Sequence, residues 1–193
     1  KSSSTVQQNS FSKNETQLIH DGGIHDPMRV YLITSQTDSI LLRQKCAPID
    51  PDSTNEDLML FVNRLYRTVT DSNSLGVGIA APQVGVLKNI IWIQRFDKKD
   101  LPFEVYLNPR IIQYTEKKQP CPEGCLSIPN KQATTQNRAY AILLEYDMLN
   151  GEHKIEMVEG FTAVIFQHEI DHLNGILFID HLKEEIKNGK SGN

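Results

Sequence analysis

The hydrophobic and polar positions divide the chain into two helical patterns separated by a series of strand-like runs. Apolar residues between 58 and 69 recur at steps of three and four, which predicts an amphipathic helix with one face in the core. Ser53 followed by Glu56 has the spacing of a capping box, so we expect this helix to begin at Ser53 and to end near Thr70. A second helical pattern covers the apolar run that leads into His168.

The segments between the two helices have the short apolar runs and turn residues of strands. We expect strands at 30–33, 90–93, 105–108 and 110–114, with Pro109 separating the last two. Asn150-Gly151, between the runs 141–148 and 152–158, is the strongest short signal of a β-hairpin. The Pro-, Gly- and Cys-containing segment 120–129 is expected to form turns, residues 176–179 a short strand or turn, and residues 181–187 a polar helix.

The first part of the chain lacks such a pattern. Residues 1–27 are rich in Ser, Gln, Asn and Thr and offer little to bury, which predicts a flexible polar tail before a single domain at 28–193. The sequence begins with Lys1 rather than Met, which is compatible with an exported form.

Composition and charge exclude several classes of function. The 193 residues are 39% hydrophobic, which suits one globular domain with a sufficient core. A net charge of −4 gives no basic surface for nucleic acid, and no apolar run is long enough to cross a bilayer. The three cysteines, Cys46, Cys121 and Cys125, cannot all pair within a monomer, so at least one thiol stays free. Composition does not predict the oligomeric state.

The strongest chemical signal is Gln167-His168-Glu169-Ile170-Asp171-His172. Two histidines four residues apart share one helix face and can hold a metal ion, while Glu169 is placed to take a proton from a metal-bound water. The alternative is a polar helix face that carries these residues by coincidence. Against it, three apolar residues precede the histidines on the same face: Phe161, Val164 and Ile165. Buried histidines on such a face need a partner or a metal.

Two histidines leave a tetrahedral metal short of a protein ligand. One class of metallopeptidases places a third His where this chain has Phe178, and Glu184 and Glu185 fall in the expected terminal surface helix. Upstream, prolines on both sides restrict Cys121. We therefore assign Cys125 as the third ligand and Cys121 to the pocket lining, although a buried inert Cys is the commoner case.

The segment 76–85, Gly-Val-Gly-Ile-Ala-Ala-Pro-Gln-Val-Gly, is dense in small residues, which allow another backbone to approach closely. It does not match the spacing of a dinucleotide-binding loop. One interpretation is a tight turn before the strand at 90–93. The other is a substrate wall with one polar side chain, Gln83, directed into a pocket.

Three segments, GVGIAAPQVG, EGCLS and QHEIDH, resemble the three motifs of the peptide deformylase family in the family's order. The resemblance spans about residues 30–181. It implies an α+β fold with antiparallel strands around a central metal-binding helix, and a deformylase catalytic domain at 28–193. It also implies a hydrolase that removes the formyl group from the N-terminal formylmethionine of nascent polypeptides.

The resemblance implies a role for each matching residue. Cys125, His168 and His172 correspond to the metal ligands, and Glu169 to the general base and acid. The Gln83 amide and the Leu126 backbone N–H correspond to donors for the developing oxyanion. An ion pair of Glu123 with Arg138 would brace the Cys125 loop. The residues expected to contact the substrate are Val77, Gly78, Cys121, Glu123, Gly124, Phe161, Val164 and Ile165.

The same resemblance implies one divalent metal ion, with Fe²⁺ expected and Zn²⁺, Ni²⁺ or Co²⁺ also compatible with a thiolate and two imidazoles. The expected partners are N-formylmethionyl peptides, encountered at the ribosome in the cytoplasm, with the peptide added as a strand along residues 76–79. Two alternatives remain: a zinc peptidase or other amidohydrolase, and a non-catalytic module whose ion only stabilises the fold. A zinc peptidase would need a further metal ligand after His172, and the sequence offers no suitable one. A structural ion would need a closed site with four protein ligands, and only three can be named.

Overall fold

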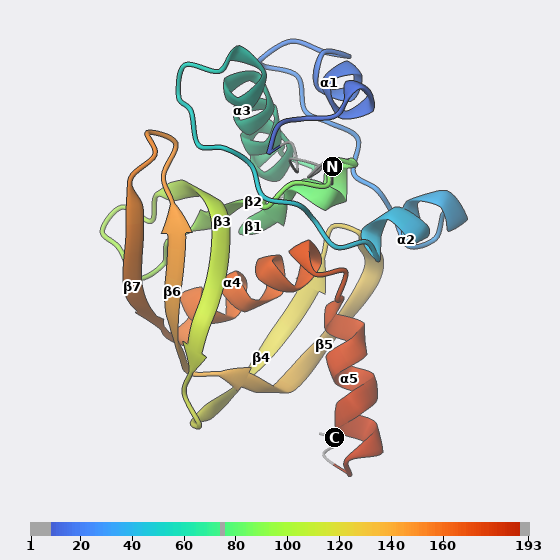
Figure 1. Ribbon diagram of the computed structural model, residues 1–193. Helices are drawn as coiled ribbons and strands as arrows, with labels where there is room; N and C mark the ends of the chain where they lie inside the picture. The colour runs from blue at the N-terminus through green and yellow to red at the C-terminus, as the bar shows by residue number, and fades with distance from the viewer. Residues whose placement is uncertain (1–8, 74–75, 190–193) are drawn as a thin grey trace, which may run out of the picture.

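The computed structural model describes residues 9–73 and 76–189 (Figure 1). Its elements, in chain order, are α1 (Lys13–Ile19), α2 (Gln36–Leu42), α3 (Glu56–Thr70), β1 (Gly78–Ala80), the 3₁₀ helix η1 (Ala81–Val84), β2 (Ile90–Gln94), β3 (Phe103–Tyr114), β4 (Lys118–Cys125), β5 (Ile128–Ala139), β6 (Ala141–Asp147), β7 (His153–Glu159), α4 (Gly160–Leu173) and α5 (Phe178–Lys187). Among these described residues, no helix combines the length and apolar character needed to cross a membrane.

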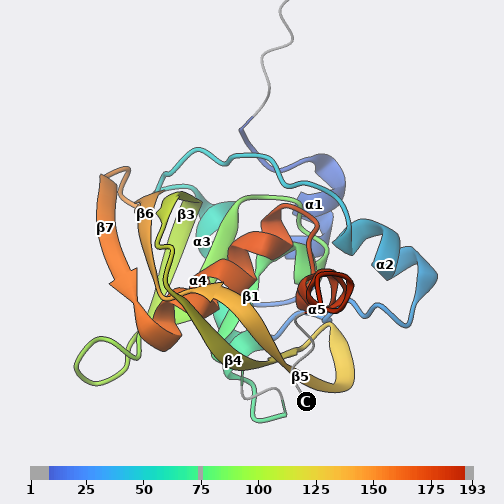
Figure 2. The ribbon, with the colours of Figure 1, turned by 90° about the horizontal axis from the view of Figure 1, so that it is seen from below.

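The strands form two antiparallel sheets around α4 (Figures 1 and 2). The larger sheet has the order β1-β2-β3-β6-β7, and β4 pairs with β5 in the smaller one. β6 and β7 form the predicted hairpin around Asn150-Gly151. The predicted α+β fold, with antiparallel strands around a central helix that carries His168 and His172, is therefore confirmed.

β1 and β2 are buried on both faces because α3 and α4 pack on opposite sides of them. Ile79 and Ile90 join the apolar face of α3, and Ala80 and Ile91 join α4. Helix α3 buries one apolar face, as predicted, whereas α4 is buried almost all round. A helix enclosed in this way holds its side chains in fixed directions, which suits a metal site.

The predicted end of α3 at Thr70 is correct, but the predicted start at Ser53 is wrong. The N-cap is Asn55, whose side-chain oxygen accepts a hydrogen bond from the Leu58 N–H at 3.0 Å. The Asp52 side chain accepts from the Thr54 N–H at 2.8 Å, and this local bond makes a turn before the helix. Ser53 therefore lies in the turn.

Two proline-containing segments differ from the prediction. Residues 105–108 and 110–114 are in a strand as predicted, but Pro109 does not separate them. Strand β3 runs through Pro109, where its pairing with β6 shifts between Leu107 and Arg110 and Asn108 has a φ of 49°. This bulge accommodates a residue without an N–H. Residues 120–129, expected to form turns, belong mostly to β4 and β5. A two-stranded sheet has a free edge on each strand, where proline is tolerated.

Residues 30–33 form no strand. The Tyr31 N–H donates to the Gln83 carbonyl at 2.7 Å, and the Ile33 N–H donates to the Ser127 carbonyl at 3.0 Å. Because these acceptors belong to different segments, the backbone bonds do not form a ladder. The segment instead links η1 to the turn between β4 and β5.

The flexible tail predicted for residues 1–27 is wrong for the part that forms α1. Ser12 and Glu15 form a capping box, and Ile19 is fully buried against the α3 side of the core. This short helix is stabilised by its cap and by the apolar side chains Leu18 and Ile19, which pack on the core. Residues 1–8 lie outside the described residues. At the other end, the expected strand or turn at 176–179 is replaced by the start of α5 at Phe178.

Candidate metal centre

Helix α4 and strand β4 bring three metal-binding side chains together. His168 and His172 project from α4, and Cys125 ends β4. The Cys125 Sγ lies 3.2 Å from His172 Nε2, and one ligand atom from each of the three residues lies within 4.8 Å of the others. One thiolate and two imidazoles fit a divalent transition metal and leave a coordination position for a further ligand. Within 9–73 and 76–189, no other group of three such residues is arranged for a metal.

Glu123 holds one of these ligands in place. Its Oε2 lies 2.7 Å from His168 Nδ1, so the ring presents Nε2 as its ligand atom. Arg138 donates to the same carboxylate through Nε at 2.8 Å and Nη2 at 2.9 Å, which is the predicted ion pair. Thr135 also donates to it. Burial alone would raise the pKa of Glu123, but hydrogen bonds with His168 and Arg138 outweigh burial and lower the pKa. The carboxylate is therefore charged.

The two histidines differ in their electrostatics. Burial and the nearby His168 lower the pKa of His172 well below its usual value, which favours the neutral ring that a metal requires. Burial would also lower the pKa of His168, but hydrogen bonds with Cys125 and Glu123 raise it instead. An ion at this site competes with the proton of His168, so metal binding releases protons. His172 Nδ1 is buried without a hydrogen-bond partner in the part of the chain that the structure describes.

Glu169 lies next to the ligands and is only 4% exposed. Its Oε2 has no hydrogen-bond partner among the described residues, and burial raises the pKa of Glu169 to about 7. A carboxyl group of this kind can both accept and return a proton near neutral pH. Gly78 makes room for it, because a Cβ at position 78 would lie 2.7 Å from Glu169 Oε1.

Gln83 directs its amide group toward Cys125. Its Oε1 accepts from the Ala80 N–H at 2.9 Å, which fixes the orientation of the amide. Its Nε2 lies 3.5 Å from Cys125 Sγ and 3.2 Å from Ser127 Oγ. Ser127, fully buried, was not singled out by the sequence analysis, although it is the last residue of EGCLS. Leu126 follows Cys125 in the turn beside this group.

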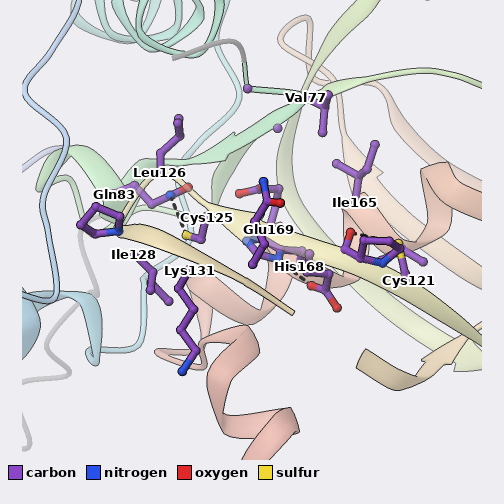
Figure 3. Close-up of a pocket in the computed structure, with 18 of the residues that line it drawn as sticks. Val77, Gln83, Cys121, Cys125, Leu126, Ile128, Lys131, Ile165, His168 and Glu169 are labelled. Atoms are coloured by element: carbon purple, nitrogen blue, oxygen red, sulfur yellow. Dashed lines mark hydrogen bonds and ion pairs between the residues drawn. The ribbon is translucent and has the colours of Figure 1, made fainter. Parts of the chain in front are cut away.

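A cavity of about 810 Å³ opens onto the site. The predicted residues that line it are Val77, Gly78, Gln83, Cys121, Glu123, Gly124, Cys125, Leu126, Phe161, Val164, Ile165, His168 and Glu169. Figure 3 shows Cys121, Ile165 and Val77 on one side of Glu169, and Gln83 with Cys125 on the other. His172 is 1% exposed and lies behind this lining. The predicted residues therefore converge on one space.

Phe161 is 45% exposed and does not fill the cavity. Its ring packs edge-on against Phe96, with the ring centroids 5.1 Å apart. The sequence analysis missed the β5 residues of the cavity wall, which run from Ile128 to Gln132. No motif marks them, because the pairing of β4 with β5 is what brings them to the site.

On the usual burial tendency of histidine, the remaining four, His20, His25, His153 and His181, are expected on the surface. His20, His25 and His153 are exposed as predicted. His181 is partly buried instead, and its Nε2 lies 2.7 Å from Asp171 Oδ2. This expectation is wrong for His181 because α5 packs beside β5, next to the end of α4, where His181 reaches Asp171. The local sequence does not reveal that contact.

Comparisons with known proteins agree with this geometry. A model of the family described as polypeptide deformylase matches residues 30–188. The chain is 38% identical over 144 residues to peptide deformylase 1 of Clostridium perfringens, covering 75% of this chain and 92% of that protein. It is 37% identical over 155 residues to the peptide deformylase of Desulforudis audaxviator, covering 79% and 94%. The crystal structure of peptide deformylase from Thermotoga maritima superposes with a TM-score of 0.70 at 30% identity, covering 81% and 97%.

Proposed function

The chain belongs to the polypeptide deformylase family, and we propose that it removes the formyl group from the N-terminal formylmethionine of nascent polypeptides. One observation carries the proposal: Cys125, His168 and His172 converge at the cavity in which Glu169 lies. Three ligands leave a position for chemistry, which distinguishes a catalytic metal site from a closed structural one.

In the proposed reaction, a bound divalent ion supplies Lewis acidity toward a water molecule and the formyl oxygen. Glu169 accepts the proton of the attacking water and returns it to the departing amine, a role worth about 10²- to 10⁴-fold in rate. The Gln83 amide and the Leu126 backbone N–H donate to the oxyanion, and loss of one such donor typically raises the barrier by about 2.7–4 kcal/mol. The Oε2 of Glu169 has no hydrogen-bond partner within 9–73 and 76–189, which supports this role because the oxygen is free to receive a proton.

The residues that line the cavity support this substrate. Cys121, Val164 and Ile165 give it an apolar wall suited to the unbranched methionine side chain. Gly78, in β1 at the edge of the larger sheet, leaves a backbone edge along which the peptide adds as an extended strand. A formyl carbon carries only hydrogen, so a narrow site admits it and rejects acetyl. Glu123, Gly124 and Phe161 complete the substrate-facing surface, with Phe161 at its mouth.

The resident ion is proposed to be iron(II). A thiolate and two imidazoles also bind zinc, nickel and cobalt, so the ligand set alone does not select among them. We further propose that the protein meets this substrate in the cytoplasm, on formylated chains at the ribosome. Anaerobic loading with each ion, followed by turnover measurements, tests the metal assignment; higher activity with zinc than with iron would overturn it.

The decisive experiment compares wild type with Glu169→Ala. We expect the variant to keep its metal content while kcat on formyl-Met-Ala falls by about 10²- to 10⁴-fold, because the ligands are intact and the proton acceptor is lost. Both quantities are measured on the same preparation. Two control substrates are used: acetyl-Met-Ala, which tests selectivity for the formyl group, and a longer peptide, which tests for cleavage of internal peptide bonds. If the variant loses metal and activity to the same extent, or loses neither, the result would instead support an ion that only stabilises the fold.

A further inference from the structure

Helix α5 contacts the metal centre although it contributes no ligand. It lies beside β5, next to the end of α4 (Figures 1 and 2). Phe178, in its first turn, is 2% exposed and stacks on the ring of His168, with centroids 6.0 Å apart and an interplanar angle of 25°. One class of metallopeptidases has a third histidine ligand at the position of Phe178. In this chain Phe178 instead packs against the ligand His168.

Glu185, two turns further along α5, is only 3% exposed although its side chain ends in a polar carboxyl group. Its Oε1 accepts hydrogen bonds from the backbone N–H groups of Gln136 at 2.8 Å and Asn137 at 3.0 Å. Hydrogen bonds to a carboxylate are stronger than neutral ones, and a buried carboxylate requires them. The two amides directly precede Arg138 in β5, so Glu185 fixes the backbone from which that arginine projects.

His181 fixes the other end of the same arginine. Its Nε2 lies 2.7 Å from Asp171 Oδ2, and that oxygen accepts from Arg138 Nη1 at 2.6 Å. Arg138 in turn binds Glu123 at 2.8 Å, and Glu123 lies 2.7 Å from His168 Nδ1. A continuous series of polar contacts therefore joins the terminal helix to a metal ligand.

We propose that α5 is a clamp on the metal centre, in which Glu185 and His181 are positioning residues that hold Arg138, and through it Glu123 and His168. This inference rests on the proposed function, because it needs His168 to be a metal ligand. Partners that orient a ligand typically change metal affinity by about 10- to 100-fold when they are removed. The clamp explains why a surface helix buries a carboxylate against two backbone amides.

The test is Glu185→Ala, with Glu184→Ala as the matched control. Glu184 is the exposed neighbour on the same helix. Cobalt(II) is loaded into each protein, its loss to a chromophoric chelator is timed, and the visible absorption of the bound ion is recorded. We expect Glu185→Ala to lose cobalt about tenfold faster and to change the absorption bands, because the ligand geometry relaxes. Glu184→Ala should match wild type in both.

Two further variants make the result decisive. His181→Phe keeps an aromatic ring but removes the ring nitrogens, and it should lose cobalt several-fold faster. Glu185→Gln retains one oxygen acceptor and should fall between wild type and Glu185→Ala. It replaces the alanine variant if that protein does not fold. Unchanged cobalt loss and spectra in folded Glu185→Ala or Glu185→Gln, and in His181→Phe, would overturn the clamp. If wild type binds no ion or does not deformylate, the proposed function itself fails.

Discussion

Two buried arginines, Arg138 and Arg95, hold clusters of carboxylates in different parts of the molecule. Arg138 is 3% exposed and Arg95 is 2% exposed. Arg138 joins Glu123 of β4 to Asp171 of α4. Arg95 follows β2 and joins the adjacent loop to β3 and β7. Both are bidentate, and burial opposes the charge of both. Their local chemistry alone does not tell them apart.

The clusters differ in what the carboxylates touch next. Glu123 is itself buried and also binds His168, so Arg138 stands one residue away from a metal ligand. The Arg95 carboxylates Asp97, Glu104 and Glu156 are 27–32% exposed in their side chains, and their further partners include the hydroxyls of Tyr106 and Tyr146. A buried ion pair is therefore weak evidence of function, and the second partner of its carboxylate is the informative feature.

The largest effect is expected from Arg138→Met. The substitution leaves Glu123 buried without its main cation, so we expect the free energy of unfolding to fall by about 3–5 kcal/mol. Because His168 loses its support, metal affinity should also fall by about 10- to 100-fold. Urea unfolding of the metal-free protein and competition with a chelator measure the two changes separately. Loss of stability with unchanged affinity would remove the distinction drawn between the two arginines.

A smaller and different effect is expected from Arg95→Met. Its carboxylates are partly hydrated, so the loss of their hydrogen bonds should lower the free energy of unfolding by about 1–3 kcal/mol. Metal affinity, and kcat measured on the folded fraction, should stay within about twofold of wild type. In the part of the chain that the structure describes, the hydrogen-bond partners of Arg95 are Asp97, Glu104, Tyr106 and Glu156, and none of them contacts a metal ligand. A tenfold fall in kcat at full folding would show that the two clusters are coupled.

The smallest effect concerns the acid stability of the Arg95 cluster. A hydrogen bond with Arg95 lowers the pKa of Asp97 below 3.8, its ordinary value. A carboxyl group with a lowered folded pKa stabilises the protein above its unfolded pKa, and this contribution is lost as the pH falls through the folded pKa. The stability gap between wild type and Arg95→Met should therefore shrink as the pH falls below about 4. Urea unfolding of both metal-free proteins across this range checks it, and a constant gap would contradict it.

The sequence predicted the elements whose signals are local. The apolar period of α3, the hairpin at Asn150-Gly151 and the metal helix α4 each depend on residues close together in the chain. It failed where distant segments decide the structure. Pro109 lies inside a strand because the β6 neighbour tolerates a bulge there, and α1 is a helix because the α3 side of the core accepts Ile19.

The same division applies to the site. The sequence predicted the three metal ligands because they lie in short motifs. The histidine pair identified the site, and the need for a third ligand then led to Cys125. Glu185 was dismissed as a surface residue, since nothing near it in the chain shows the two amides of β5 that it binds. Arg95 gave no signal either, because its carboxylates come from three separate segments.

The absent side chain at Gly78 has a consequence for variation at this position. A methyl group there would come within 2.7 Å of Glu169 Oε1 and 2.9 Å of Ile165 Cγ2, so even alanine would displace the carboxylate or the helix that carries it. Substitution of Gly78 is therefore an unfavourable way to weaken the binding of a molecule that occupies the cavity. A ligand that follows this backbone closely would rest on a surface to which no side chain can be added without moving Glu169 and Ile165.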